Sequence, residues 1–155
     1  MNKELEKAIR ILVKEFGKNR KMYLATSYEN LPKVKIVNTY YWNRSFYLVT
    51  LESSEILQQV MKNGKVSLCS TASFHKFQGE AIKIGHPLKV ENKEIRDVLT
   101  EALSDWYFEH HDESDPNLCL VQIKINTAFT YANKIGYKVD FSKDELNSFR
   151  FAPNG

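Results

Sequence analysis

Cysteine, glycine and proline are scarce in this sequence. Its 155 residues include two cysteines, six glycines and four prolines. Cys69 and Cys119 lie in separate strand-like segments with no second Cys or His at metal-ligand spacing, so we expect two reduced, packed thiols rather than a disulfide or a zinc site. The scattered glycines form no G-x-G-x-x-G pattern and no P-loop, which excludes the common phosphate-binding loops.

Long apolar runs and a strong charge imbalance are also missing. No segment approaches the roughly 20 apolar residues of a membrane helix, and the start, MNKELEKAIR, is too polar for a signal peptide. The formal net charge of +3 is small and the lysines are spread along the chain, so no nucleic-acid partner is required. We therefore expect a cytoplasmic protein with neither a membrane nor a nucleic-acid partner.

Patterns of catalytic and metal-binding residues are weak. The sequence holds no convincing Ser-His-Asp order and no pair of catalytic carboxylates, which argues against a hydrolase and leaves no catalytic residue to name. The run HHDESD contains the ligand types of a metal site, at His110, His111, Asp112, Glu113 and Asp115. Adjacent side chains in a loop normally diverge, so we interpret this run as a solvated loop at the end of a helix and predict no metal site.

The composition that remains is that of one globular domain spanning residues 1–155. Hydrophobic residues make up 43% of the chain and charged residues 26%. Apolar residues recur at helical spacing near the start, and Gly17 is a natural stop, so a helix is predicted over residues 2–17. Its apolar stripe consists of Leu5, Ala8, Ile9, Leu12, Val13 and Phe16.

Strand-like segments follow from residue 21. The segments MYLATSY, KVKIVNTYYW and SFYLVT are separated by turn-forming ENLP and NR, and KVSLCSTA, FQGEAIKIGHPLKV, LCLVQIKINTAFTYA and GYKVDF come later. In the long segment after residue 117, Cys119, Val121, Ile123 and Ile125 face one way, and Leu118, Leu120, Gln122, Lys124 and Asn126 the other. This order predicts a mainly β fold, an antiparallel barrel of six to seven strands over about 21–141, with peripheral α-helices and a tail over 142–155.

Two more helices are predicted between the strands. A short one runs from about Ser54 to Asn63 and ends at the NG dipeptide. A longer one covers about 92–111, with Asn92 as a plausible N-cap. Its apolar face consists of Ile95, Val98, Leu99, Ala102, Leu103 and Trp106.

Two features suggest a ligand without defining it. Thr50, Ser53 and Ser54 put hydroxyls at a strand-to-helix junction, where free N–H groups favour an anion, yet no Lys or Arg stands between Thr50 and Met61. The junction is therefore either a phosphate site without its cation or a capped helix. Five aromatic residues also gather in one hairpin-like region: Tyr40, Tyr41, Trp42, Phe46 and Tyr47. Three interpretations stay open for them: stacking on a planar ligand, stacking on single-stranded bases, or filling the barrel.

The order of several short motifs resembles the FMN-binding split barrel of the pyridoxamine 5'-phosphate oxidase-like superfamily. The motifs are LATS at 24–27, PKVKIV at 32–37, FYLVT leading into SSEILQQVMKNGKVSL, and GEAIKIG at 79–85. The likeness runs over about 21–141, and IGHP, NKEI, WYFEH and GYKVDF resemble a branch of small bacterial general-stress-protein-like members. It implies a split β-barrel and a homodimer that holds FMN in two clefts between its subunits.

The resemblance also implies which residues approach the cofactor. Lys35 would lie beside the phosphate, and Val37, Asn38, Thr39 and Tyr40 would run along the isoalloxazine ring. The resemblance places Thr50, Ser53 and Ser54 at the ribityl phosphate. Trp106 and Tyr107 either pack on the barrel or wall the partner's flavin cleft, and His75 and His86 contact a flavin, ligate a haem or simply pack.

The sequence departs from the family pattern at two places. Family members often carry a Lys two residues after the Ser that matches Ser54, whereas this chain has Ile56, so Lys35, Lys62 or the partner would have to supply the positive charge. The C-terminal substrate motif of the oxidases, an Arg and a His, is reduced to Arg150. We therefore expect an FMN-dependent oxidoreductase with an undefined small-molecule substrate, with a non-catalytic flavin- or haem-binding barrel as the alternative.

Overall fold

A computed structural model describes residues 2–153 of the chain. Within them it shows three α-helices, one short 3-10 turn and eight strands. The helices are α1 (Lys3–Phe16), α2 (Glu55–Lys62) and α3 (Lys93–His110). The strands are β1 (Arg20–Tyr28), β2 (Leu31–Trp42), β3 (Ser45–Leu51), β4 (Lys65–Ser70), β5 (Lys76–Gly85), β6 (Leu118–Ala132), β7 (Ile135–Asp140) and β8 (Glu145–Arg150).

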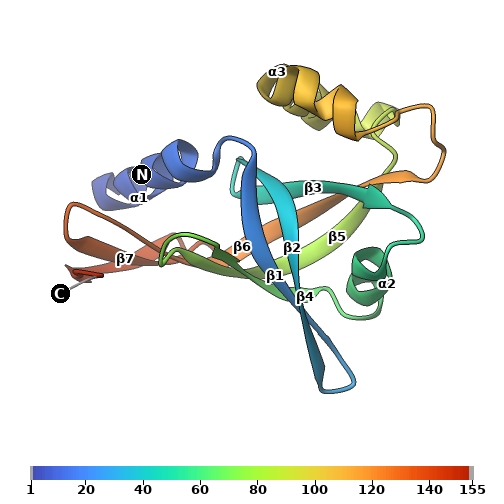
Figure 1. Cartoon of the computed structure of the whole chain (residues 1–155). Helices are drawn as coiled ribbons and strands as arrows, with labels where there is room; N and C mark the ends of the chain where they lie inside the picture. Colours follow the sequence, from blue (N-terminus) through green and yellow to red (C-terminus); the bar gives the residue numbers. More distant parts are fainter. Residues whose placement is uncertain (1, 154–155) are drawn as a thin grey trace.

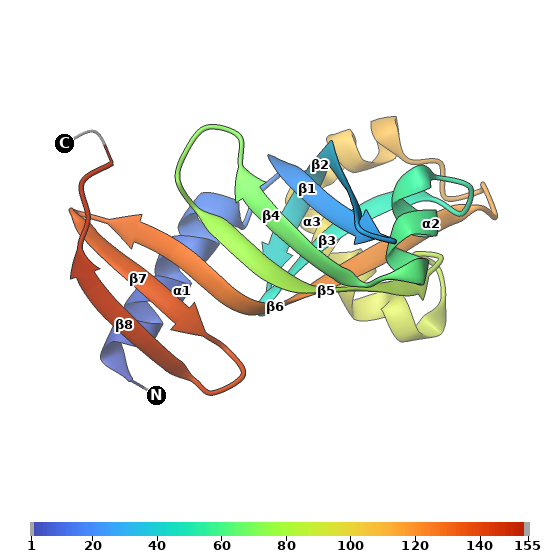
Figure 2. The same cartoon turned by 90° about the horizontal axis from the view of Figure 1, so that it is seen from below.

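Six antiparallel strands close into a barrel, and two more extend it on one side. The sheet runs β3-β2-β1-β4-β5-β6-β7-β8, and the additional pairing of β3 with β6 closes the first six strands. The hairpin of β7 and β8 continues from the distal half of β6, away from the barrel and beside α1 (Figure 2). The predicted fold class is confirmed. The segment 142–155, predicted as a tail, instead contains β8. Only Leu146 of β8 packs against the core, so the sequence of this strand shows no alternation of apolar and polar residues.

Short hairpin turns set the register of the barrel. Two central turn residues with positive φ, Glu29 and Asn30, join β1 to β2, and Asn43 and Arg44 join β2 to β3. Such turns match the right-handed twist of the paired strands. Gly79 lies at a register shift between β5 and β6, where a Cβ would stand 2.2 Å from the Lys124 carbonyl oxygen, so no larger residue fits without moving the backbone.

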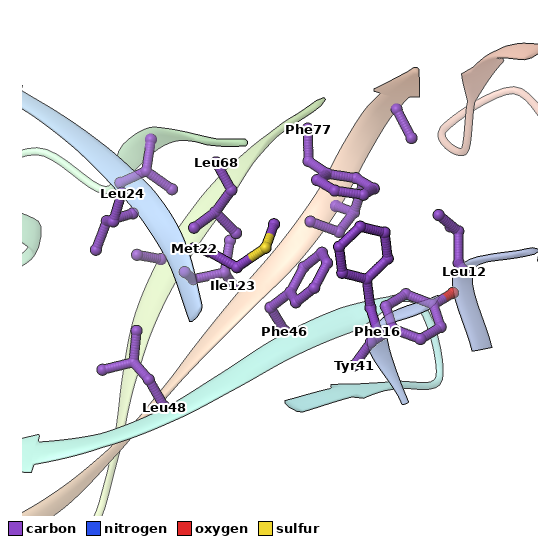
Figure 3. Packing of buried hydrophobic residues seen from close by; sticks show 14 of the residues in the cluster. Leu12, Phe16, Met22, Leu24, Tyr41, Phe46, Leu48, Leu68, Phe77 and Ile123 are labelled. Atoms are coloured by element: carbon purple, nitrogen blue, oxygen red, sulfur yellow. The ribbon is translucent and has the colours of Figure 1, made fainter. Parts of the chain in front are cut away.

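The main core fills the barrel and extends under α1 (Figure 3). Phe16, in the last turn of α1, meets Phe46 and Phe77 edge-to-face with ring centroids 5.6 and 5.2 Å away. One of the two predicted faces of β6 lies wholly in this core, as expected from strand alternation; its residues are Cys119, Val121, Ile123 and Ile125. The predicted stripe of α1 is wrong at Val13, which is 55% exposed.

The helix α3 lies against the outside of the barrel, over β3 (Figure 1). Ile95 and Leu99 pack with Tyr47 and Leu120 in a second, smaller apolar cluster. The predicted continuous helix is interrupted at Ser104, which has a φ of 49° and a ψ of −129°. The interruption rotates the second half of α3.

Three predictions about the 92–111 segment and the cysteines are corrected. Beyond the interruption of α3, Tyr107 is fully buried and Trp106 is only half-buried, and before it Ala102, predicted on the apolar face, is exposed. Asn92 does not cap α3, because its side-chain amide donates to the carbonyls of Ile84 and His86. Cys119 is buried as expected, but Cys69 is exposed.

Within the described residues, no helix is long and apolar enough to cross a membrane.

Candidate functional site

A cleft of about 210 Å³ lies between the outside of the barrel and α3. Its barrel side is formed by neighbouring parts of β2 and β3, and Leu99, Leu103 and Trp106 of α3 form the opposite side. Most of the lining is apolar or aromatic. The polar lining residues are Asn19, Asn38, Thr39 and His111, besides the hydroxyls of Tyr40 and Tyr47. An apolar site with a few polar groups is the usual form of a small-molecule site.

Four of the eight predicted cofactor-binding residues line this cleft together. They are the consecutive residues Val37, Asn38, Thr39 and Tyr40 of β2. Because side chains alternate along a strand, these four residues do not present their side chains alike. Val37 packs in the barrel core and the Thr39 hydroxyl donates to the Arg20 carbonyl, while Asn38 and Tyr40 lie on the outer face of β2. Asn38 and Tyr40 are therefore the two whose side chains can contact a ligand.

Sequence reasoning missed the wall that α3 supplies. Trp106 and His111 line the cleft of their own chain, opposite β2. Tyr107 is buried beneath α3, so it packs on the barrel. The sequence pattern predicts a solvated loop at His111, because the helical periodicity gives no sign that α3 is interrupted; the structure corrects this prediction. The neighbouring residue, His110, is exposed to solvent, as predicted.

The start of α2 is a capped helix. The Ser54 hydroxyl accepts a hydrogen bond from the Leu57 backbone N–H at 3.1 Å, which satisfies one of the free donors of the first turn. Ser53 is exposed, and Thr50 is half-buried on β3, opposite Cys119 of β6. The hydroxyl of Ser54 therefore binds the helix itself, and the structure leaves Ser53 and Thr50 outside the cleft lining.

Two lysines nevertheless stand at this helix start. The ammonium groups of Lys35 and Lys33 lie 3.0 and 3.2 Å from the same carboxylate oxygen of Glu55, in the first turn of α2. Hydrogen bonds from Lys35 and Lys33 hold the pKa of the Glu55 carboxyl below its ordinary value. Lys35 directly precedes Ile36, and Glu55 directly precedes Ile56; both isoleucines line the cleft. The backbone of Lys35 is thus next to the cleft, whereas its side chain lies on the other face of β2 from Ile36 and is paired with Glu55 outside the cleft lining.

Ile56 serves two surfaces at once. It lines the cleft and also packs, half-buried, against the main core. Lys62, the other candidate for a compensating charge, is exposed and its ammonium stands 4.9 Å from the centre of the Tyr28 ring, outside the cleft lining. Of the two candidates within this chain, only Lys35 is adjacent to the cleft.

A polar cluster fixes the two halves of α3 to the loop that follows. Arg96 binds both carboxylate oxygens of Glu113, at 2.7 and 3.0 Å, and the Tyr107 hydroxyl donates to Glu113 at 3.0 Å. The Arg96 guanidinium lowers the pKa of the Glu113 carboxyl, and burial together with Glu113 raises the pKa of Tyr107. Bidentate Arg–carboxylate pairs fix geometry as well as charge, so this cluster holds the interrupted helix in its observed shape.

The remaining histidines are engaged elsewhere. His75 is buried, with its Nδ1 2.7 Å from the Thr130 hydroxyl, and its ring stacks on Tyr131. In His86, Nδ1 accepts from the Leu88 backbone N–H and Nε2 donates to the Asp115 carbonyl. Neither histidine lines the cleft. Among residues 2–153, no three His, Cys, Asp or Glu side chains are grouped to hold a metal ion.

A second, wider hollow of about 1130 Å³ runs along the outer face of the sheet. Tyr23 and Val34 line it on β1 and β2, and Phe129 and Lys138 line it on β6 and β7. Its apolar rim is continuous with the cleft, because the exposed side chain of Ile36, on the same face of β2 as Val34, also lines the cleft.

Comparison with known proteins identifies the fold. No family model and no curated protein matches the sequence. Among solved structures, the chain is similar to a Clostridium acetobutylicum protein related to general stress protein 26, of the pyridoxinephosphate oxidase family, with a TM-score of 0.62 at 15% identity over 92% of this chain and 98% of that one. It is also similar to a pyridoxamine 5'-phosphate oxidase-related, FMN-binding protein from Nostoc punctiforme, with a TM-score of 0.57 at 14% identity over 98% and 96%.

A third similar structure is a haem-binding protein from Mycobacterium smegmatis, with a TM-score of 0.59 at 14% identity over 97% of this chain and 59% of that one. At 14–15% sequence identity, these three matches show a shared fold only. The barrel of six strands, the two added strands and these matches agree with the motifs quoted above. The chain has the split-barrel fold of the pyridoxamine 5'-phosphate oxidase-like proteins.

Proposed function

We propose that this chain is an FMN-binding flavoprotein that works in the cytoplasm as a homodimeric oxidoreductase on a small-molecule substrate. The observation that carries the proposal is the cleft beside β2, which brings Val37, Asn38, Thr39 and Tyr40 together, with Lys35 and the start of α2 directly beside it. An apolar slot with a basic pair on the adjoining part of β2 fits a planar ring that carries a phosphate. A bound flavin supplies the redox chemistry, and the protein supplies its binding and orientation.

The roles of the binding residues follow from their positions. Asn38 can hydrogen-bond the polar edge of the ring, and Tyr40 and Trp106 offer apolar faces on opposite sides of the cleft. Lys35 can bind the phosphate when it exchanges Glu55 for that anion. Ser54 then acts through the local helix start rather than as a direct ligand, because its hydroxyl already caps α2. Thr50 and Ser53 stay proposed phosphate ligands.

The direct test is an absorption spectrum of the purified protein, followed by titration with FMN. We expect a flavin band, or quenching of flavin fluorescence on titration, and mass identification of the released chromophore as FMN. A colourless protein that leaves flavin fluorescence unchanged contradicts the proposal. Reduction of the bound flavin by NADH or NADPH at an enzyme-like rate then separates an oxidoreductase from a barrel that only holds the cofactor.

The size of the two hollows supports a dimer. Ligand sites usually measure 300–1,000 Å³, so the 210 Å³ cleft of one chain encloses only part of a flavin. The wider hollow and the exposed Val34 and Ile36 next to it, at 65% and 61% exposure, form an apolar face continuous with the cleft. A second copy of the chain seated on this face would close the cleft and bury the exposed apolar side chains.

Light scattering tests the dimer, with the double substitution Val34→Glu and Ile36→Glu as a disruptor. Both side chains are exposed in the single chain, so the substitutions should leave its fold intact while charging the face. We expect a dimeric wild type and a monomeric variant that binds FMN more weakly. A wild-type monomer fully loaded with FMN contradicts the dimer. A substitution on a different exposed face, Val13→Glu, is the control and should not change the mass.

Haem binding, suggested by the likeness to a haem-binding protein, is less well supported by the residues. The two histidines considered as haem ligands, His75 and His86, make hydrogen bonds inside the chain and do not line the cleft. A haem titration without a Soret shift would agree with this view.

A further inference from the structure

His111 is the one ionisable imidazole that lines the cleft. It follows α3 directly, and its backbone N–H donates to the Tyr107 carbonyl, which fixes where the side chain begins. Its ring makes edge contacts with Trp106 and Tyr107 at 5.5 and 5.1 Å between centroids. Within residues 2–153, no side chain forms a hydrogen bond with the His111 ring, and the His110 backbone is the hydrogen-bond partner that acts on its pKa, so one ring nitrogen remains available to a ligand in the cleft.

The neighbouring histidine differs in each of these respects. The His110 ring is exposed, stacks on Trp106 with 4.3 Å between centroids, and has its Nδ1 2.9 Å from the Trp106 carbonyl oxygen. His110 does not line the cleft. The chain therefore offers two adjacent histidines, one inside the site and one outside it, as a matched pair.

The surroundings of His111 favour its neutral form. Burial and the nearby His110 ring lower the pKa of His111, and a hydrogen bond to the His110 backbone and the more distant Glu113, which is bound to Arg96, oppose this shift. From the other elements, the cleft adds Tyr40 and Tyr47 and the amides Asn19 and Asn38 but no carboxylate. A neutral imidazole offers one donor and one acceptor, whereas an imidazolium offers two donors and brings a charge into an apolar cleft.

We propose that His111 is a hydrogen-bonding residue of the flavin cleft that must be neutral for the ligand to bind, and that the ligand class it selects is a planar heteroaromatic ring with nitrogen or oxygen at its edge. This inference rests on the proposed flavin site. It assigns to α3 a part in recognition that is separate from the phosphate end at Lys35. Protonation of His111 and binding of the ring then oppose each other.

The test measures affinity against pH, using riboflavin as well as FMN. The phosphate of FMN titrates near pH 6, so riboflavin, which has the ring without the phosphate, isolates the response of His111. Wild type should lose about tenfold in riboflavin affinity for each pH unit below the pKa of His111, because one proton must leave on binding. His111→Gln keeps a polar side chain without titration and should show a flat profile. His110→Gln should follow the wild type.

A second measurement uses the wild type alone and does not depend on how the variant folds. The Cε1–H resonance of His111, followed by NMR from pH 5 to 8, should titrate at a lower pH when riboflavin is bound, while that of His110 should shift little. Flavin binding with the same pH slope in wild type and His111→Gln, or an unmoved His111 resonance, overturns the inference alone. If neither FMN nor riboflavin binds at any pH, the proposed function fails and this inference fails with it.

Discussion

The ammonium of Lys35 lies 3.0 Å from the carboxylate of Glu55, and Lys33 lies 3.2 Å from the same oxygen. Under the proposed function, the positive charge that the family pattern provides after the strand-to-helix junction would come in this chain from β2. The negative charge that balances it comes from the first turn of α2. A phosphate entering this corner competes with Glu55 for both lysines.

Glu55→Gln should therefore strengthen FMN binding. The substitution frees Lys33 and Lys35 and removes a negative charge, and surface pairs of this kind correspond to about two- to fivefold in affinity. Riboflavin affinity should not change, because riboflavin carries no phosphate. Fluorescence titration with both ligands at low and high salt measures the effect. An equal gain for riboflavin would show that Glu55 acts on the ring instead.

Ile56→Lys restores the family's usual residue at the edge of the cleft. Ile56 is half-buried, so the long side chain of a lysine can cover the same apolar surface and place its ammonium in the cleft. We expect FMN to bind about tenfold to a hundredfold tighter, from a charge-assisted bond of roughly 1.5–3 kcal/mol. The melting temperature should fall modestly. A large loss of stability without tighter FMN binding would place Ile56 wholly in the core.

Phe16→Ala should destabilise the fold by about 3–5 kcal/mol, because it leaves a cavity among Phe46 and Phe77. Val13→Ala, on the exposed side of the same helix, is the control and should change stability by about 0.5 kcal/mol or less. Urea denaturation monitored by circular dichroism gives both values. Similar losses for the two variants would mean that the apolar stripe of α1 packs as the sequence pattern suggested.

The folding stability of the protein should fall in mild acid because of His75. Burial lowers the pKa of His75, so the unfolded chain binds a proton that the folded chain resists. Stability is then full above about pH 6.5 and declines below it, by up to about 1.4 kcal/mol per pH unit, until the folded pKa is reached. His75→Asn should reduce this slope between pH 6.5 and 5. Thr130→Val, which removes the partner but keeps the histidine, should retain it.

Arg96→Met should loosen the second half of α3. It leaves the Glu113 carboxylate, whose side chain is only 13% exposed, without its cation, at a cost of about 1–3 kcal/mol at pH 7. Because Arg96 lowers the pKa of Glu113, the stabilisation is present above about pH 4.3 and is lost as the pH falls further. Hydrogen exchange of the α3 amides, measured at pH 7 and again below about pH 4.3, reports this loss of stability. Lys93→Met, which removes an exposed pair with Asp97, should have little effect.

Local patterns in the sequence determined most of the elements. The alternation in β6 placed Val121 and Ile123 in the core, and the two residues Asn43 and Arg44 formed the expected turn. Period and turn chemistry act between residues close in the chain, so they can be read without the fold. The helix cap at Ser54 belongs to the same class, because its partner, Leu57, is three residues away.

The tertiary structure alone decided the site. Nothing near Ser104 in the sequence shows that α3 is interrupted there, yet that interruption buries Tyr107 and turns Trp106 and His111 to the cleft. Likewise, Lys35, about twenty residues before Glu55 in the chain and on another element, meets that carboxylate at the start of α2. Contacts between residues distant in the chain depend on how the strands close the barrel and on which face each helix covers. Periodicity does not encode that choice.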